Sequence, residues 1–155
     1  MGPLADRRRL DAMEALTTDA VACGARVAIG GAHIDNRGHF FAPTVLADAP
    51  VTARAMNEES FGPIALVAAF RDYESVIREA NRLACGLAAF AWTQSARTMM
   101  NVSQDLEARM VSINHHGLAL PELPFGGLKD SGCGSEGGAK ALEAYLNPKL
   151  VTQMT

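Results

Sequence analysis

The sequence predicts an α/β fold built around a parallel β-α-β-α-β unit. Three apolar runs, residues 64–70, 87–92 and 110–113, have the composition of strands buried on both faces of a sheet. The two segments between these runs carry apolar residues at helical spacing. Each connection is long enough to join parallel neighbours by the usual right-handed crossover.

The first element in the chain is expected to be an amphipathic helix. Its apolar side chains recur at three- and four-residue steps and are Leu10, Met13, Leu16, Ala20 and Val21. Gly24 can end this helix in a left-handed conformation. Residues 26–29 then form a short strand.

A hairpin-like region follows. The residues Asp35-Asn36-Arg37-Gly38 have turn chemistry and separate two extended pieces within residues 33–46. Residues 53–59 are expected to form a short helical turn that leads into the first buried strand.

Helix boundaries in the middle of the chain are set by polar residues. Asp72 is expected to cap the first helix, and Gly86 is expected to end it. The inward stripe of this helix is Val76, Ile77, Ala80 and Leu83. Thr93 or Ser95 begins the second helix, whose inward residues are Met99, Val102 and Leu106.

Regular periodicity stops after Asn114. Residues 115–135 are predicted to be a loop, residues 136–146 a helix, and residues 150–154 a terminal strand. We expect one domain over residues 1–147, followed by a separate C-terminal strand over residues 148–155.

Composition narrows the class of protein. The chain has 155 residues and 48% hydrophobic residues, which is the composition of a globular protein. Its formal charge of −3 gives no excess of basic residues that would favour binding to nucleic acid or to an anionic membrane. Three cysteines without CxxC spacing, and no signal sequence, predict a cytoplasmic protein.

The glycine-rich stretch 126–138 has two interpretations. A loop with Lys129 and Ser131 suggests phosphate binding, but Asp130 separates the two residues, so P-loop spacing is absent. A GxGxxG pattern begins at Gly132 without a predicted strand before it. Tight structural turns are therefore favoured over phosphate contact.

Few other residues have a pattern suited to chemistry. Glu59 is as suited to capping a helix as to binding a ligand hydroxyl. His115 and His116 follow the third strand, where they can line a pocket, but adjacent residues in extended chain make a poor chelate, so no metal site is expected. No cysteine is at an activating position, so no catalytic nucleophile is expected.

Taken in order, several segments resemble the C-terminal portion of the NAD(P)-dependent aldehyde dehydrogenase superfamily. The most diagnostic are Glu58-Glu59-Ser60-Phe61-Gly62-Pro63 and Pro124-Phe125-Gly126-Gly127-Leu128-Lys129-Asp130-Ser131-Gly132. Supporting matches are Gly2-Pro3-Leu4, residues 41–46, Gly86-Leu87-Ala88-Ala89, Val111-Ser112-Ile113-Asn114 and Glu136-Gly137-Gly138. The resemblance covers nearly the whole chain and implies the catalytic-domain fold of that family.

The resemblance implies an enzyme that oxidises an aldehyde to a carboxylic acid through a cysteine nucleophile, with hydride transfer to NAD or NADP. Glu59 matches the residue that binds the nicotinamide ribose, and Phe61 matches the aromatic beside the nicotinamide. Phe125 matches a residue of the aldehyde tunnel, and packing in the core is the alternative role for its ring. The loop that shapes substrate choice includes His115, His116, Leu118 and Leu120.

The family's cysteine, general-base glutamate, oxyanion-hole asparagine and cofactor domain all precede Gly2-Pro3-Leu4. We therefore expect the isolated chain to be an inactive fragment of such an enzyme. The alternative is a non-catalytic, self-associating interaction module.

The resemblance leans towards the succinate-semialdehyde dehydrogenase branch, which binds a substrate carboxylate partly through a serine in the specificity loop. Residues 117–121 offer no hydroxyl, and they suit an aliphatic or aromatic aldehyde equally well. Residues 149–154 match the family's oligomerisation strand, which implies a homo-oligomer.

Overall fold

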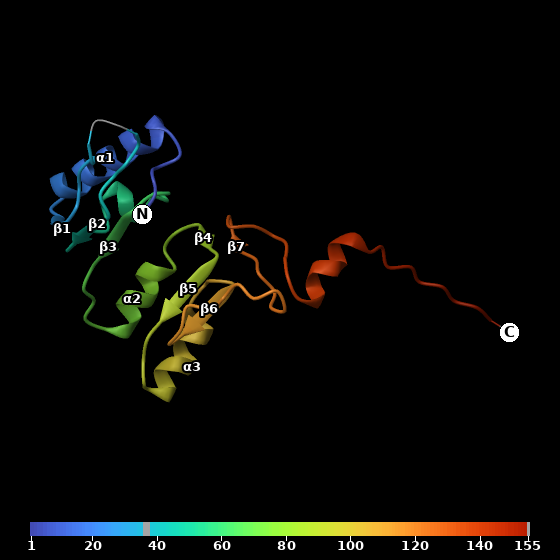
Figure 1. The fold of residues 1–155 in the computed structure, drawn as a ribbon. Helices are drawn as coiled ribbons and strands as arrows, with labels where there is room; N and C mark the ends of the chain where they lie inside the picture. Colours follow the sequence, from blue (N-terminus) through green and yellow to red (C-terminus); the bar gives the residue numbers. More distant parts are fainter. Residues whose placement is uncertain (36–37, 155) are drawn as a thin grey trace. The chain divides into compact units, whose positions relative to one another are not determined.

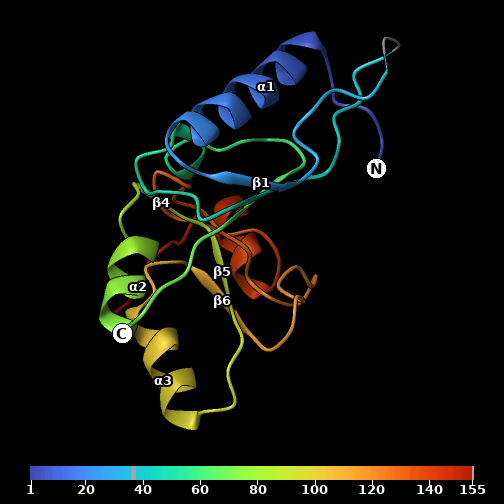
Figure 2. The same cartoon turned by 90° about the vertical axis from the view of Figure 1, so that its left-hand side faces the viewer.

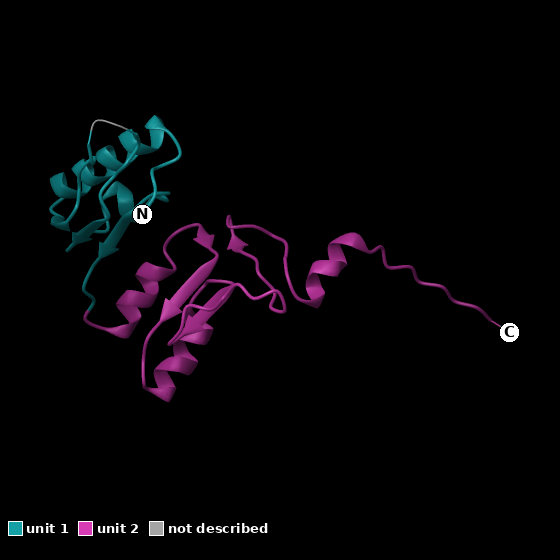
Figure 3. Ribbon diagram, viewed as in Figure 1, with its two compact units in different colours: residues 1–70 teal, residues 71–155 magenta. Residues whose placement is uncertain are grey.

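The computed structural model describes residues 1–35 and 38–154. The chain forms two compact units, residues 1–70 (unit 1) and residues 71–155 (unit 2), which are coloured separately in Figure 3. Both units combine helices with short strands, so the predicted α/β class is confirmed (Figure 1). The centre of the predicted turn, residues 36 and 37, lies outside the described residues.

Unit 1 begins with helix α1 (Arg7–Ala22), which starts where Asp6 accepts a hydrogen bond from the Arg9 amide at 3.0 Å. The predicted apolar face is buried, and its residues are Leu10, Met13, Leu16, Thr17 and Ala20. The prediction for Val21 is wrong: this residue is exposed on the last turn of the helix. Gly24 follows with φ +113°, as the left-handed helix end requires.

The sheet of unit 1 contains β1 (Arg26–Ile29), β2 (Thr44–Ala47) and β3 (Ile64–Val67), in the order β1-β2-β3. The β1–β2 pair is antiparallel and the β2–β3 pair is parallel. A short 3-10 helix, η1 (Arg54–Met56), lies in the connection between β2 and β3. The core forms where Leu46, Ile64 and Leu66 pack with residues of α1.

Unit 2 contains α2 (Tyr73–Ala80), β4 (Cys85–Gly86), β5 (Ala88–Ala91), α3 (Ala96–Asp105), β6 (Met110–Ile113), β7 (Leu128–Lys129) and η2 (Ala139–Tyr145). Strands β5 and β6 are parallel, as predicted, and β4 pairs with β7. Helices α2 and α3 lie beside the β5–β6 pair (Figures 1 and 2). The predicted caps are confirmed, because Asp72 accepts from the Ser75 amide and Ser95 from the Thr98 amide.

Three boundary predictions are wrong. Helix α2 ends at Ala80, so Leu83 lies beyond it, and Gly86 belongs to β4 rather than to the helix end. Gly86 is required there because a Cβ would meet the carbonyl oxygen of Glu107. The segment predicted as a helix over residues 136–146 forms the shorter 3-10 helix η2.

Residues 146–154 are neither helix nor strand in this single chain, so the terminal strand stays a prediction.

Among the three apolar runs, β3 pairs with β2 in parallel within unit 1, and β5 pairs with β6 in parallel within unit 2. The predicted burial on both faces is wrong for residues 64–70 and 87–92, whereas residues 110–113 are buried or half-buried throughout. Val67, Phe90 and Trp92 are all about half exposed. The reason is that each of these strands has only one of its faces covered by the described residues. No helix in the described chain has the length and apolar character needed to span a membrane.

Candidate cofactor and substrate site

The first candidate site is the loop over residues 57–63 of unit 1, which joins η1 to β3. Of its two adjacent carboxylates, only that of Glu58 forms hydrogen bonds with another described side chain. The Arg54 guanidinium donates to both Glu58 oxygens, at 2.8 and 3.0 Å. This pairing holds the pKa of Glu58 below its usual value. Glu59 is exposed and makes no side-chain bond with another described residue, so it caps no helix. Of the two interpretations of Glu59, helix capping is therefore wrong.

Phe61, two residues later, has a backbone conformation that a bulky side chain rarely adopts. Its φ is +44°, and its ring is 68% exposed. Such strain persists only where the surrounding structure enforces it, and it is concentrated at functional sites. The exposed ring and the free carboxylate of Glu59 are thus presented together by one constrained loop.

Helix α1 holds this loop in place. The Nη2 atom of Arg9 donates to the carbonyl oxygen of Ser60 at 2.9 Å, and the Nε of Arg9 is buried without a hydrogen-bond partner. Gly62 lies so close to the fully buried Met13 that a Cβ would overlap the sulfur atom. Arg9 and Met13 therefore fix the backbone on both sides of Phe61. The sequence offered no signal for the contact between Arg9 and Ser60, because 51 residues separate them.

The second candidate site is the loop that follows β6 in unit 2. Asn114, at φ +62°, exchanges two hydrogen bonds with the backbone of Thr93, at 2.9 and 2.8 Å. The buried Ser112 hydroxyl donates to the carbonyl oxygen of His115 at 2.6 Å. These bonds tie the start of the loop to the ends of β5 and β6, the end of a parallel sheet at which α/β proteins bind ligands.

The two adjacent histidines have different surroundings. The Nδ1 of His115 accepts a hydrogen bond from the Gly117 amide at 3.0 Å, so this ring stabilises its own loop. The ring of His116 packs against Trp92 and Phe90, with centroid separations of 4.9 and 5.7 Å. We call Phe90, Trp92 and His116 the aromatic cluster. This cluster was not predicted from the sequence, although the spacing of Phe90 and Trp92 places them on one face of a strand.

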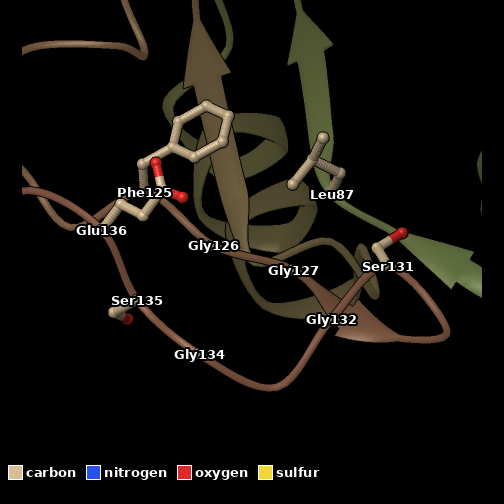
Figure 4. A pocket seen from close by; sticks show the side chains of 9 residues that line it. All are labelled: Leu87, Phe125, Gly126, Gly127, Ser131, Gly132, Gly134, Ser135 and Glu136. Atoms are coloured by element: carbon tan, nitrogen blue, oxygen red, sulfur yellow. The ribbon is translucent and has the colours of Figure 1, made fainter. Parts of the chain in front are cut away.

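Phe125, the predicted tunnel residue, lines a pocket of about 300 Å³ in the glycine-rich loop (Figure 4). The lining residues are Leu87, Phe125, Gly126, Gly127, Ser131, Gly132, Gly134, Ser135 and Glu136. The backbones of Phe125 and Glu136 exchange two hydrogen bonds of 2.7 Å, which places their side chains together at one end of the pocket. Leu118 is half-buried and Leu120 is exposed, and neither lines this pocket.

The polar residues of the glycine-rich loop are engaged within the protein. The Nζ of Lys129 donates to the carbonyl oxygens of Asn81 and Leu83, at 2.9 and 3.1 Å, and pairs with Glu107. The Ser131 hydroxyl accepts from the Gly86 amide at 2.9 Å. These contacts agree with the structural interpretation that the sequence favoured over phosphate binding.

All three cysteines are exposed and free. Cys23 lies at the carboxyl end of α1, as its C-cap residue. Cys85 and Cys133 are exposed and free of disulfides. No three His, Cys, Asp or Glu side chains among the described residues are grouped closely enough to hold a metal ion.

The predicted residues fall into two groups. The cofactor candidates, Glu59 and Phe61, belong to unit 1, and the substrate candidates belong to unit 2. Within unit 2, the structure brings His116 to the aromatic cluster and Phe125 to the pocket.

Known proteins resemble this chain in both sequence and structure. Residues 1–151 match the aldehyde dehydrogenase family. The chain is 42% identical over 151 residues to 4-(hydroxymethyl)benzenesulfonate dehydrogenase TsaD1 of Comamonas testosteroni, covering 97% of this chain and 31% of the relative. It is 39% identical to the NADP(+) succinate-semialdehyde dehydrogenase GabD of Escherichia coli, with the same coverage. A crystal structure of an E. coli NADP-dependent enzyme superposes with a TM-score of 0.92 at 39% identity, covering 95% of this chain and 31% of that one. The chain thus spans about a third of the length of the relatives it matches.

Proposed function

Because the chain belongs to the aldehyde dehydrogenase family, we propose that it forms part of an enzyme that oxidises an aldehyde to a carboxylic acid with NAD or NADP. The observation that carries this proposal is the match across residues 1–151. The nicotinamide cofactor, when bound, supplies the hydride acceptor. The residues of this chain bind the cofactor and shape the substrate site.

On the cofactor side, Glu59 accepts hydrogen bonds from the nicotinamide ribose hydroxyls, and Phe61 packs beside the nicotinamide. The geometry of the loop supports these roles. The Glu59 carboxylate has no partner among the described residues, so its acceptor atoms are available for a pair of hydroxyls. An exposed ring held at positive φ has a flat apolar face available for stacking.

On the substrate side, Phe125, His115, His116, Leu118 and Leu120 line the path of the aldehyde. Support comes from Phe125 at the pocket and from the position of the loop at the carboxyl ends of β5 and β6. The loop residues are mostly apolar, which suits an aliphatic or aromatic aldehyde. Of the relatives named above, the succinate-semialdehyde dehydrogenase is named for an aldehyde substrate, and the other is named for a benzenesulfonate that carries a hydroxymethyl group.

We propose that the chain on its own does not catalyse the reaction. Thioester chemistry requires an activated thiol, and none of the three cysteines lies at the N-terminus of a helix in the described chain. We further propose that residues 148–154 pair as a strand with another copy, because Leu150, Val151 and Met154 project into solvent without partners. A location in the cytoplasm, where cysteines stay reduced, fits the three free thiols.

The test is a chimera in which residues 1–151 replace the matching part of the E. coli succinate-semialdehyde dehydrogenase. We expect the chimera to reduce NAD or NADP with an aldehyde, and the isolated chain to give no reduction. In the chimera, Glu59→Gln should raise KM for the cofactor about 10- to 100-fold, since charged hydrogen bonds to the ribose are weakened. The matched control is Glu14→Gln, an exposed glutamate on α1.

Two outcomes would contradict the proposal. Aldehyde-dependent reduction of NAD or NADP by the isolated chain would disprove its inactivity. A cofactor KM that changes no more in the Glu59→Gln chimera than in the Glu14→Gln chimera would disprove the role of Glu59.

A further inference from the structure

Arg109 directly precedes β6 and connects this strand with the glycine-rich loop of unit 2. Its backbone amide donates to the carbonyl oxygen of Gly86 in β4 at 3.2 Å. Its Nη2 atom donates to the Ser135 hydroxyl at 2.6 Å, across 26 residues of sequence. One residue therefore joins the start of β6 both to β4 and to the glycine-rich loop.

The Arg109 side chain also packs against the loop backbone at Gly126. A Cβ on Gly126 would lie 3.1 Å from the Nε and 3.3 Å from the Cδ of Arg109, and 2.5 Å from the carbonyl oxygen of Gly134. These groups occupy the space into which a side chain at position 126 would project. Glycine is therefore required at this position, and the Arg109 side chain fills part of the space that glycine leaves.

The two contacts of Arg109 flank Phe125. Gly126 follows Phe125 in the chain, Ser135 precedes Glu136, and the backbones of Phe125 and Glu136 exchange two hydrogen bonds of 2.7 Å. Arg109 thus contacts the neighbour of each member of this pair, at the end of the pocket where Phe125 lies (Figure 4). Arg109 itself is not one of the described residues that line the pocket.

The composition of the loop explains why such a contact is needed. Residues 126–138 include six glycines, and glycine loses more conformational freedom than any other residue when its backbone is ordered. Arginine is suited to restraining this backbone, because its planar guanidinium donates hydrogen bonds while its stem packs against a surface. The order of the Phe125 backbone should therefore depend on a residue outside the loop.

We propose that Arg109 is a positioning residue that holds Phe125 in place and thereby determines which aldehydes the site accepts. The inference rests on the proposed function for the role of Phe125 in substrate binding, whereas the link from Arg109 to Phe125 is independent of it. An aromatic aldehyde should depend on this link more than a short aliphatic one, because it contacts more of the Phe125 ring.

Hydrogen exchange of the isolated chain, measured by NMR, tests the link. Arg109→Met keeps an unbranched apolar stem but cannot donate to Ser135. It should speed the exchange of the Phe125 and Glu136 amides about 3- to 10-fold, since the pair loses its restraint. The Asn114 amide, which donates to Ala91 at the far end of the β5–β6 pair, should exchange at the parent rate, which separates this effect from a general loss of folding.

Two further variants sharpen this measurement. Arg97→Met removes the same charge from an exposed position on α3 and should leave all of these amides unchanged. Ser135→Ala removes the acceptor and should also speed the exchange of the Phe125 and Glu136 amides. Because Arg109 and Ser135 act through one contact, the double variant should exchange no faster than the faster of the two single variants.

The chimera of the preceding section tests the consequence for the substrate, with benzaldehyde and propanal as probes. Arg109→Met should raise KM for benzaldehyde about 3- to 10-fold and KM for propanal by a smaller factor. The cofactor KM should stay within about twofold, since Glu59 and Phe61 belong to unit 1. A merely structural role would change all three values together.

Several results would overturn the inference. Parent rates of exchange at Phe125 and Glu136 in Arg109→Met, or single-variant effects that add in the double variant, would disprove the link. Faster exchange with equal changes in KM for the two aldehydes would disprove the role in selectivity. A parent chimera that oxidises no aldehyde would count against the proposed function, while the exchange rates would still decide whether Arg109 holds Phe125.

Discussion

The two units are stabilised by different interactions. Ten of the twelve buried apolar side chains in the described chain belong to unit 1, where α1 covers the sheet. Unit 2 has only two of them, and side-chain hydrogen bonds to backbone groups join its elements instead. Burial of apolar area is the larger stabilising term in folding, so unit 1 should be the more stable unit. The difference shows that two neighbouring units of one chain can bury very different numbers of apolar side chains.

The largest change in stability is expected from a substitution in the apolar core of unit 1. Leu10 is fully buried on α1, so Leu10→Ala should lower the free energy of unfolding by about 2–5 kcal/mol through lost burial and a residual cavity. Hydrogen exchange should show the loss in the amides of α1, β2 and β3. Val21→Ala, at an exposed site on the same helix, should cost less than about 1 kcal/mol. Equal costs at the two sites would show that the apolar core of unit 1 does not dominate its stability.

A second prediction concerns the polar network of unit 2. The Asn81 side chain donates to the carbonyl oxygen of Asp105 at 2.7 Å and accepts from the Glu107 amide at 2.8 Å. Asn81→Ala removes both bonds and should cost about 1–3 kcal/mol, with faster exchange of the Glu107 amide. The exposed Gln94 supplies the control, Gln94→Ala. An unchanged exchange rate at Glu107 would show that this network contributes little to unit 2.

Local signals in the sequence predicted local structure. Asp72 and Ser95 were identified as helix caps because a cap acts on an amide three residues away, and the buried face of α1 followed from spacing alone. Contacts between distant segments had no such signal. Asn81 bonds across 24 and 26 residues, and nothing around it indicates its partners.

The candidate site was predictable to the same extent: its local motif could be identified, but its contacts with distant segments could not. The motif that contains Glu59 and Phe61 was recognisable, but the strain at Phe61 and the support from Arg9 depend on how α1 packs against the loop. The burial of residues 64–70 and 87–92 was predicted wrongly for a different reason. Their composition specifies coverage on both faces, and the described residues provide it on one.

A smaller effect should appear in unit 2 at alkaline pH. Tyr73 on α2 donates to Asp105 at 2.7 Å, and partial burial together with this bond raises the pKa of Tyr73 to about 12. The raised pKa means that the neutral phenol stabilises the fold below pH 10, and that this stabilisation is lost as the pH rises from 10 to about 12. Phenolate absorbance should report the titration, and Tyr73→Phe should remove it. Ionisation of Tyr73 at its ordinary pKa of 10.0 would contradict the prediction.

The smallest effect is expected in unit 1 at acid pH. Asp6 caps α1, and hydrogen bonds from the Arg8 side chain and then from the Arg9 amide hold the pKa of its carboxyl below the ordinary value of 3.8. A lowered pKa means that the ionised form stabilises the fold at neutral pH, and that this contribution disappears as the pH falls from 3.8 through the folded-state pKa. Asp6→Asn keeps a capping oxygen but cannot titrate. The parent should therefore melt slightly above the variant at pH 7, and the gap should close only below pH 4. Because the other carboxyl groups titrate equally in both proteins, a gap that closes above pH 5, or persists at pH 2, would show that the charge of Asp6 does not stabilise α1.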